Sequence, residues 1–234
     1  MQLFFQENIT PPLVTLDPDE SKHLTRVLRK KQGDLISLTN GKGQLFECVI
    51  LEANPLKTTL KVVNSIAVPE EDFYIHLAIA PTKSPDRMEW MAEKITEIGF
   101  HELTLLETVN SERNYLKTDR LEKKIISACK QSLKYRIPKL NPICRLDDFL
   151  ESKEFEDYQK FIAYVDEHHD FHLFDSAKAK RKYLVLIGPE GDFDPSEIKK
   201  ALSNGFEPVS LGKSRLRTET AGLVICEMLQ ILNR

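Results

Sequence analysis

The chain has 234 residues and a formal net charge of −3, a length that accommodates one large domain or two modest ones. No apolar stretch approaches the ~20 residues that a membrane-spanning helix needs, and residues 1–5 lack the basic leader of a signal peptide, so we expect a soluble cytoplasmic protein without membrane contact. The slightly acidic charge argues against broad non-specific nucleic-acid binding, although it permits a local basic patch.

Residues 1–70 are predicted to form a small β-rich domain with one helix. Asp17 is a suitable N-cap, Pro18 fits the first helical position and Glu20 completes a capping box, so the helix starts here; Gly33 is expected to end it. Asn40-Gly41 is a strong hairpin signal between two strand-like segments. The predicted strands are 35–39, 45–51 and 58–63, followed by a polar linker at 68–72.

From residue 73 the pattern changes to alternating strands and helices. Buried strands are predicted at 73–80, 103–106, 161–165, 183–187 and 208–211. Helices are predicted at 85–98, 118–135 and 218–232, with another that starts at 194–197. This alternation indicates an α/β domain over residues 71–234, with a mostly parallel sheet covered by helices on both faces.

Two glycine-containing loops follow apolar strands in the last quarter of the chain. The first is Gly188-Pro189-Glu190-Gly191, and the second begins at Leu211-Gly212. Glycine after a buried strand lets backbone N–H groups approach a ligand, and ligands bind outside the carboxyl ends of strands in open α/β sheets. The two loops therefore predict one shared pocket.

Other nucleotide-binding patterns fit these loops poorly. No glycine fingerprint follows the first strand, no G-x-G-x-x-G occurs, and the upstream glycine that a phosphate-binding P-loop requires is Glu207. The alternative is that the loops are ordinary turns with Thr218 as a helix cap. Backbone access at the glycines, apolar walls at Leu211 and Leu216, and nearby hydroxyls suit a methyl donor such as S-adenosylmethionine.

The chain resembles the SPOUT methyltransferases with a trefoil knot, and specifically the ribosomal RNA small subunit methyltransferase E family. The matching motifs are Gly188-Pro189-Glu190-Gly191, Leu211-Gly212, Leu216-Arg217-Thr218-Glu219-Thr220-Ala221, His23-Leu24, Val27-Leu28-Arg29, Arg87-Met88-Glu89-Trp90, Lys94, Glu97, Gly99, Ser111-Glu112-Arg113, Cys129 and Gln131. The resemblance implies an N-terminal PUA-like β-barrel at 1–70 and a C-terminal knotted α/β domain at 71–234. It also implies a homodimer that forms through the knot domain.

The resemblance implies that three loops bind S-adenosylmethionine. The cofactor-binding residues are then Val165, Ile187, Gly188, Pro189, Glu190, Gly191, Leu211, Gly212, Leu216, Arg217, Thr218, Thr220 and Ala221. One departure is Asp192, which stands where the family has a second glycine. We expect this position to need an unusual φ, which aspartate tolerates better than most residues.

The implied reaction is methylation of N3 of a uridine in 16S rRNA of the small ribosomal subunit. It requires loss of the N3 proton and stabilisation of negative charge on the base. Arg217 is the best candidate to place positive charge beside the pyrimidine oxygens, and Glu219 could orient Arg217 or accept a proton. The alternative is a local ion pair at a helix start.

RNA contacts are predicted from basic residues in both domains. The residues are Lys22, His23, Arg26, Arg29 and Lys30 around the first helix, Lys83, Arg87 and Arg113 in the second domain, and Arg136. The alternative for the first group is a solvated helix face, with His23 partly buried. At 133–134 this chain has Leu-Lys where the family has an arginine, so Arg136 could carry the phosphate contact there.

No metal site is predicted. The four cysteines are scattered without ligand spacing and are expected to be reduced. His168 and His169, with acidic neighbours, are better explained as a solvated loop. Two other functions remain open: a knotted methyltransferase that acts on tRNA, and a non-catalytic RNA-binding assembly factor.

Overall fold

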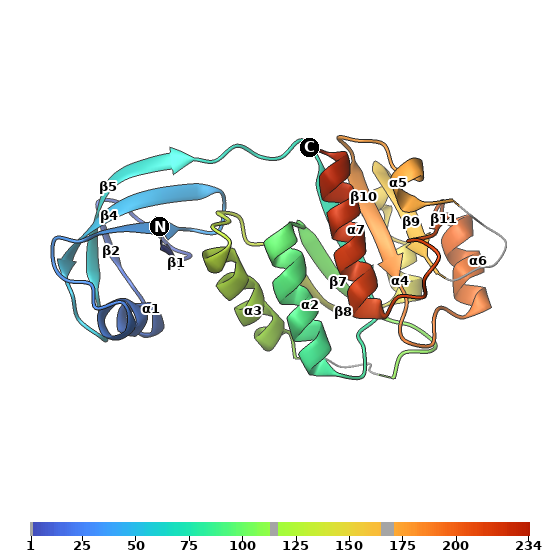
Figure 1. The fold of residues 1–234 in the computed structure, drawn as a ribbon, viewed down its shortest axis with the longest axis horizontal. Helices are drawn as coiled ribbons and strands as arrows, with labels where there is room; N and C mark the ends of the chain where they lie inside the picture. Colours follow the sequence, from blue (N-terminus) through green and yellow to red (C-terminus); the bar gives the residue numbers. More distant parts are fainter. Residues whose placement is uncertain (1, 113–116, 165–170) are drawn as a thin grey trace. The chain divides into compact units, whose positions relative to one another are not determined.

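The computed structural model describes residues 2–112, 117–164 and 171–234. The chain divides into two compact units, the first formed by residues 1–70 and 126–137 and the second by residues 71–125 and 138–234 (Figure 1). The sequence placed a domain boundary after residue 70 but did not anticipate that segment 126–137 belongs to the first unit.

The first unit contains a five-stranded sheet in the order β1-β3-β4-β5-β2. Its strands are β1 (Leu3–Phe5), β2 (Leu13–Thr15), β3 (Leu35–Thr39), β4 (Gln44–Glu52) and β5 (Thr59–Ala67). The three predicted strands and the hairpin between β3 and β4 are confirmed. The prediction missed β1 and β2, which are too short to show a clear apolar alternation. Phe4, Leu24, Leu38, Ile50 and Leu60 form the buried core.

The helix of the first unit is shorter than predicted. It consists of α1 (Pro18–Lys22) and a π-helical turn, η1 (His23–Val27), and the predicted end at Gly33 is wrong because Arg29 already leaves the helix with φ 54°. The Asp17 cap is confirmed, since its Oδ1 accepts a hydrogen bond from the Glu20 N–H at 2.8 Å. The Glu20 carboxylate pairs with Lys130 instead of closing the capping box.

The second unit contains a six-stranded, all-parallel sheet in the order β11-β9-β10-β6-β7-β8. Its strands are β6 (Tyr74–Ile79), β7 (Glu102–Glu107), β8 (Lys139–Arg145), β9 (Tyr158–Ala163), β10 (Lys182–Ile187) and β11 (Glu207–Val209). The predicted parallel sheet is confirmed. The prediction missed β8, an edge strand that contains Pro142, where a proline weakens the sequence signal.

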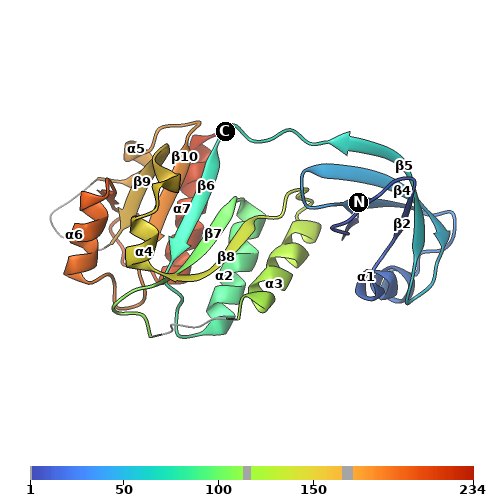
Figure 2. The ribbon, with the colours of Figure 1, turned by 180° about the vertical axis from the view of Figure 1, so that it is seen from behind.

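Helices cover both faces of this sheet (Figures 1 and 2). On one face α2 (Pro85–Ile98) packs against α7 (Thr218–Leu232). The helices α4 (Leu146–Leu150) and α6 (Pro195–Ser203) contribute to a core on the other face. Gly222 permits the close approach of α7 to α2, because a Cβ there would lie 3.1 Å from the Met91 Sδ.

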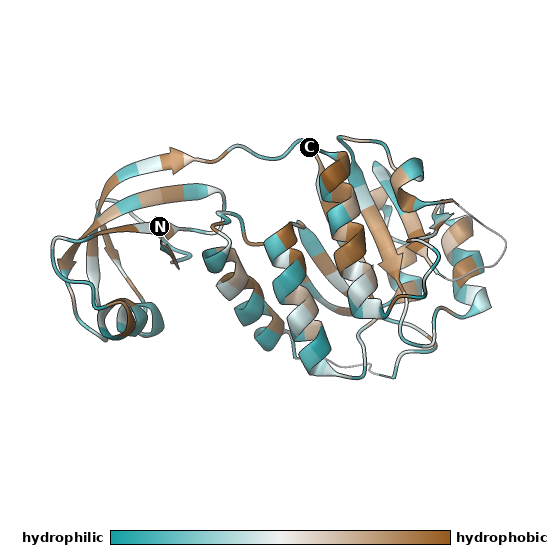
Figure 3. Ribbon diagram, in the orientation of Figure 1, coloured by the Kyte–Doolittle hydropathy of each residue, from teal (hydrophilic) through white to brown (hydrophobic). Residues whose placement is uncertain are grey.

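The remaining helices are α3 (Thr118–Gln131), the 3₁₀ turn η2 (Lys153–Phe155) and α5 (Leu173–Ser176). The prediction extended α3 to residue 135, but Leu133 adopts φ 57° and the helix has already ended. Figure 3 shows that α7 is the most continuously hydrophobic helix. Among the described residues, no helix is long and apolar enough to cross a membrane.

Candidate active site

Four neighbouring strands end together at one edge of the parallel sheet. Ile187 at the end of β10 lies beside Ile79 of β6 and Ala163 of β9, and Ala163 lies beside Val209 of β11. Because these carboxyl ends are in register, the loops that follow β10 and β11 meet at the same edge, beside the end of β9. The shared pocket predicted from the two glycine loops is therefore present.

The pocket has a volume of about 1000 Å³. It is lined by Ala163, Tyr164, His172, Ile187, Gly188, Pro189, Glu190, Asp192, Val209, Ser210, Leu211, Gly212, Lys213, Ser214, Arg215, Leu216, Arg217, Thr218 and Ala221. Its lining combines apolar side chains, the exposed backbone of Gly212 and hydroxyl groups, a mixture typical of small-molecule sites.

The first glycine loop is a tight turn that depends on Asp192. The Asp192 N–H donates to the Pro189 carbonyl at 3.0 Å, and Asp192 then takes φ 62°. The predicted unusual φ at this position is therefore confirmed. Aspartate tolerates it because its Oδ1 accepts the next N–H, that of Phe193, at 2.8 Å. At Gly188 a Cβ would lie 3.2 Å from Phe193, so the turn has little room for a side chain there.

A buried hydrogen bond joins the two glycine loops. The Thr218 hydroxyl, in the first turn of α7, donates to the Gly188 carbonyl at 3.0 Å. Gly212, in the second loop, adopts φ 119° and would have open space beside a Cβ, so its backbone is accessible from the pocket. The start of α7 is therefore fixed to the loop after β10, and both loops form one wall.

Further polar contacts anchor the first loop from outside the pocket. Glu190 Oε1 accepts the Lys83 N–H at 3.1 Å, and the Asn110 side chain donates to the Asp192 carbonyl at 3.0 Å. The contacts hold this loop to the segments that follow β6 and β7.

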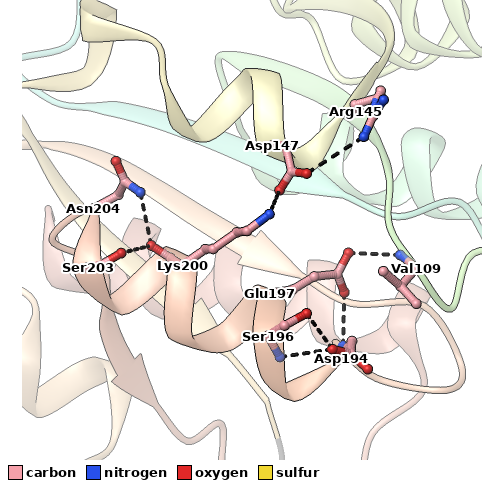
Figure 4. Close-up of polar contacts among 9 residues, drawn as sticks. All are labelled: Val109, Arg145, Asp147, Asp194, Ser196, Glu197, Lys200, Ser203 and Asn204. Carbon is pink, nitrogen blue, oxygen red and sulfur yellow. Dashed lines mark hydrogen bonds and ion pairs between the residues drawn. The ribbon is translucent and has the colours of Figure 1, made fainter.

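The helix that follows the first loop starts with a complete capping box. The Asp194 carboxylate accepts the Ser196 N–H at 2.9 Å, and Glu197 Oε2 accepts the Asp194 N–H at 2.9 Å (Figure 4). Glu197 Oε1 also accepts the Val109 N–H at 2.8 Å. The predicted start of α6 is confirmed, and its cap ties the loop after β10 to the loop after β7.

Arg217 and Glu219 occupy different environments. Arg217 is exposed, lines the pocket, and forms no side-chain hydrogen bond or ion pair with any described residue. Glu219 is only 5% exposed and is not among the lining residues. Its Oε1 lies 3.7 Å from Arg87 Nε on α2, and its buried Oε2 has no partner among the described residues. Glu219 therefore faces α2 and Arg87, whereas Arg217 faces the pocket.

Most of the predicted cofactor residues line the pocket. Those that do not are Gly191 and Thr220, and Val165 lies outside the described residues. Among the lining residues that the sequence missed are Tyr164, His172, Lys213 and Arg215. The sequence offered one signal for the last two, since they lie inside the second glycine loop. His172 has no comparable signal, because a bridge to Ser210 brings it there.

The predicted RNA-binding residues are dispersed over both units. Lys22, His23, Arg26 and Arg29 are exposed around η1, and Lys30 is half-buried. In the second unit Lys83 pairs with Glu112 and Arg87 with Glu219, while Arg113 lies outside the described residues.

Arg136 has a structural role inside the first unit. Its guanidinium donates to the Lys42 carbonyl at 3.1 Å and the Val68 carbonyl at 3.0 Å. It also packs over Gly43, where a Cβ would collide with the guanidinium group. The side chain thus joins the loop between β3 and β4 to the segment after β5.

The described residues contain no cluster of histidine, cysteine and carboxylate side chains that could hold a metal ion. The acidic and histidine segment 166–170 lies outside them. The four cysteines are free, and Cys48, Cys129 and Cys226 are buried. Burial raises the pKa of the Cys48 thiol to about 11 and that of Cys129 to about 12, so both thiols are protonated at neutral pH.

Comparisons with known proteins identify the family to which this fold belongs. The model of the RNA methyltransferase domain matches residues 69–230, and that of the RNA methyltransferase PUA domain matches residues 16–63. A curated relative, ribosomal RNA small subunit methyltransferase E of Buchnera aphidicola, is 29% identical over 92% of this chain and 86% of its own length.

Solved structures of other proteins resemble this chain over its whole length. A crystal structure described as a probable rRNA-methyltransferase from Porphyromonas gingivalis is 42% identical, with a TM-score of 0.94 over 100% of this chain and 98% of that one. Ribosomal RNA small subunit methyltransferase E of Neisseria gonorrhoeae, bound to S-adenosyl methionine, is 27% identical with a TM-score of 0.86 over 100% and 98%. The predicted α/β fold class with an N-terminal PUA-like domain is confirmed. The chain belongs to the ribosomal RNA small subunit methyltransferase E family of RNA methyltransferases.

Proposed function

We propose that this protein transfers a methyl group from S-adenosylmethionine to N3 of a uridine in 16S rRNA. The observation that carries the proposal is the pocket at the carboxyl ends of β9, β10 and β11, with Arg217, which pairs with none of the described side chains, on its rim. The Neisseria gonorrhoeae relative, which shares this fold over 98% of its length, was solved with S-adenosyl methionine.

The residues present fit this cofactor. Gly212 leaves its backbone open to the pocket, Ile187 and Leu211 supply apolar contact, and the volume suits a nucleoside-sized ligand. When bound, the cofactor supplies an electrophilic methyl group on a sulfonium. The loops hold and orient it, and orientation dominates the rate of a displacement of this kind.

Arg217 is the proposed catalytic residue. Negative charge develops on the pyrimidine oxygens when N3 loses its proton, and a guanidinium beside them lowers the energy of that state. Glu219 faces Arg87 rather than the pocket, so we assign it a positioning role at the start of α7.

We also propose that the enzyme acts in the cytoplasm as a homodimer formed through the second unit. On α7, Ile231 is exposed, and Leu223, Val224 and Met228 are only partly buried, so this helix offers apolar surface for such a contact.

The test is mass spectrometry of nucleosides from 16S rRNA of cells that lack the protein, followed by complementation. We expect 3-methyluridine to disappear and to return with the wild-type gene. Unchanged 3-methyluridine would overturn the proposal. Loss of a methylated nucleoside from tRNA instead would favour the knotted tRNA methyltransferase, and no change in either RNA would favour a binding-only assembly factor.

A further inference from the structure

One side of the pocket carries three exposed cations. Lys213, Arg215 and Arg217 are exposed, and all three line the pocket. Within the described part of the chain, none of the three side chains forms a hydrogen bond or an ion pair. Lys83 and Arg87, predicted for RNA binding from sequence, are by contrast paired with Glu112 and Glu219.

The backbone turns Arg215 and Arg217 away from the protein core. Arg217 has an extended conformation, with φ −72° and ψ 154°, immediately before α7. Leu216 between them is half-buried, as expected when alternate residues of an extended segment point to opposite sides. The two guanidinium groups therefore share the solvent side of the rim.

The charges on this rim repel one another, and the carboxylates among the described lining residues lie on the other loop. Glu190 and Asp192 belong to the loop after β10, and Glu190 is already engaged with the Lys83 N–H. The N-terminus of α7, a 15-residue helix, adds partial positive charge at the same place. An anion at this rim would relieve the repulsion.

This inference rests on the proposed function. We propose that Lys213 and Arg215 bind backbone phosphates of the RNA strand on either side of the uridine whose base enters the pocket. N3 lies on the base-pairing edge, so an enzyme must take the nucleotide out of its stack, which costs a few kcal/mol. Contacts to the flanking phosphates offset that cost and fix the register of the strand.

The pocket has room for such a base. Small-molecule sites span roughly 300 to 1,000 Å³, and this pocket lies at the upper end with about 1000 Å³. Space therefore remains beside a bound cofactor, and the rim cations stand where the strand would pass. Lys213 and Arg215 are positioning residues in this scheme, and Arg217 remains the side chain that contacts the uracil ring.

The test compares K213A/R215A with the matched control R181A/K199A. Arg181 and Lys199 are exposed in the same unit, lie outside the pocket and have no ion pair among the described residues. Binding to small ribosomal subunits from cells lacking the protein is measured by filter binding across a salt series, with S-adenosylmethionine affinity measured by calorimetry.

We expect K213A/R215A to weaken subunit binding and to reduce the slope of log affinity against log salt by about 0.7 for each cation removed. The control should keep the wild-type slope, K213R/R215K should restore it, and cofactor affinity should stay unchanged. A wild-type slope in K213A/R215A would overturn the inference, as would a loss of cofactor affinity with subunit binding intact. If the slope changes as expected but wild type forms no 3-methyluridine, the phosphate contacts hold and the proposed function fails.

Discussion

Arg217 and Glu219 are two positions apart in the sequence, yet they lie in different environments and have different roles. Arg217 precedes the first turn of α7 and points its charge into solvent at the pocket. Glu219 lies within that turn, is buried against α2, and leaves one carboxylate oxygen without a partner among the described residues. A buried carboxylate with one open oxygen is costly, so its contact with Arg87 is the interaction that keeps it there.

The separate roles predict a specific effect of Arg217→Ala. We expect kcat to fall on the order of 10²- to 10³-fold, because the charge that stabilises the deprotonated base is lost. S-adenosylmethionine affinity, measured by calorimetry, should persist at least in part. Arg217→Lys keeps the charge without the bidentate geometry and should be intermediate. Full activity of the alanine variant would contradict the assignment.

A buried histidine in β6 makes the stability of the second unit depend on pH. His76 is fully buried, its Nε2 lies 2.7 Å from Thr104 Oγ1, and its Nδ1 lies 3.9 Å from Glu102 Oε2. Burial outweighs the attraction of Glu102 and lowers the pKa of His76 to about 4, from an ordinary value of 6.5. The folded protein therefore holds this imidazole neutral at neutral pH.

Acidification should accordingly destabilise the fold. Between pH 6.5 and about 4 the unfolded chain binds a proton at His76 that the folded chain does not, so the free energy of unfolding falls as the pH decreases through this window. The slope for this group approaches about 1.4 kcal/mol per pH unit. Urea unfolding of wild type and His76→Gln at pH 7, 6 and 5 isolates the effect. An equal pH dependence of the free energy of unfolding in both proteins would disprove the contribution of His76.

At the scale of elements, the start of α7 organises the pocket. The helix begins where two loops meet, and one hydroxyl, that of Thr218, connects them through the Gly188 carbonyl. The same helix packs along α2 through Gly222 and Met91. A disturbance at the first turn of α7 therefore reaches the loop after β10 directly.

Thr218→Val tests this connection. The variant keeps the shape of the side chain but leaves the buried Gly188 carbonyl without its donor, which costs about 1–3 kcal/mol of unfolding free energy. We expect weaker S-adenosylmethionine binding by calorimetry together with the stability loss by urea unfolding. Thr218→Ser retains the hydroxyl and should bind as wild type does. Unchanged binding in the valine variant would show that the loops hold their positions without this bond.

At the scale of the whole molecule, the first unit is completed by a segment from the middle of the chain. The Ile137 N–H donates to the Gly41 carbonyl, and the Gly43 N–H donates to the Tyr135 carbonyl, each at 2.9 Å. Lys130 adds its pair with Glu20. The two domains are thus not two consecutive stretches of sequence.

A fragment of residues 71–234 should therefore be less stable than the full chain, even though it contains the entire sheet of the second unit. We expect it to unfold at a lower temperature than the full chain, and hydrogen exchange at the Ile137 amide to lose protection because Gly41 is gone. Amides in β6 and β10 should stay protected and serve as the internal control. Equal protection of Ile137 in both proteins would contradict the assignment of segment 126–137 to the first unit.

The sequence was most informative where structure depends on local physics. The bounds of α2, the start of α6, the Asn40-Gly41 hairpin and the φ of Asp192 all follow from neighbouring residues, and each is confirmed. Short β1 and β2, and β8 with its proline, were missed because a strand of few residues is stabilised by its partners more than by its own pattern.

By itself, the sequence determined the α/β class, the order of its main elements, the presence of two glycine loops at strand ends and, through its motifs, the family. Only the tertiary structure decided that His172 reaches the pocket, that Glu219 turns toward α2 while Arg217 does not, and that residues 126–137 complete the first unit. The reason is that burial and pairing are set by residues distant in the chain. A local sequence pattern indicates which side chains an element carries, whereas the packing of the sheet and helices determines which of those side chains come into contact.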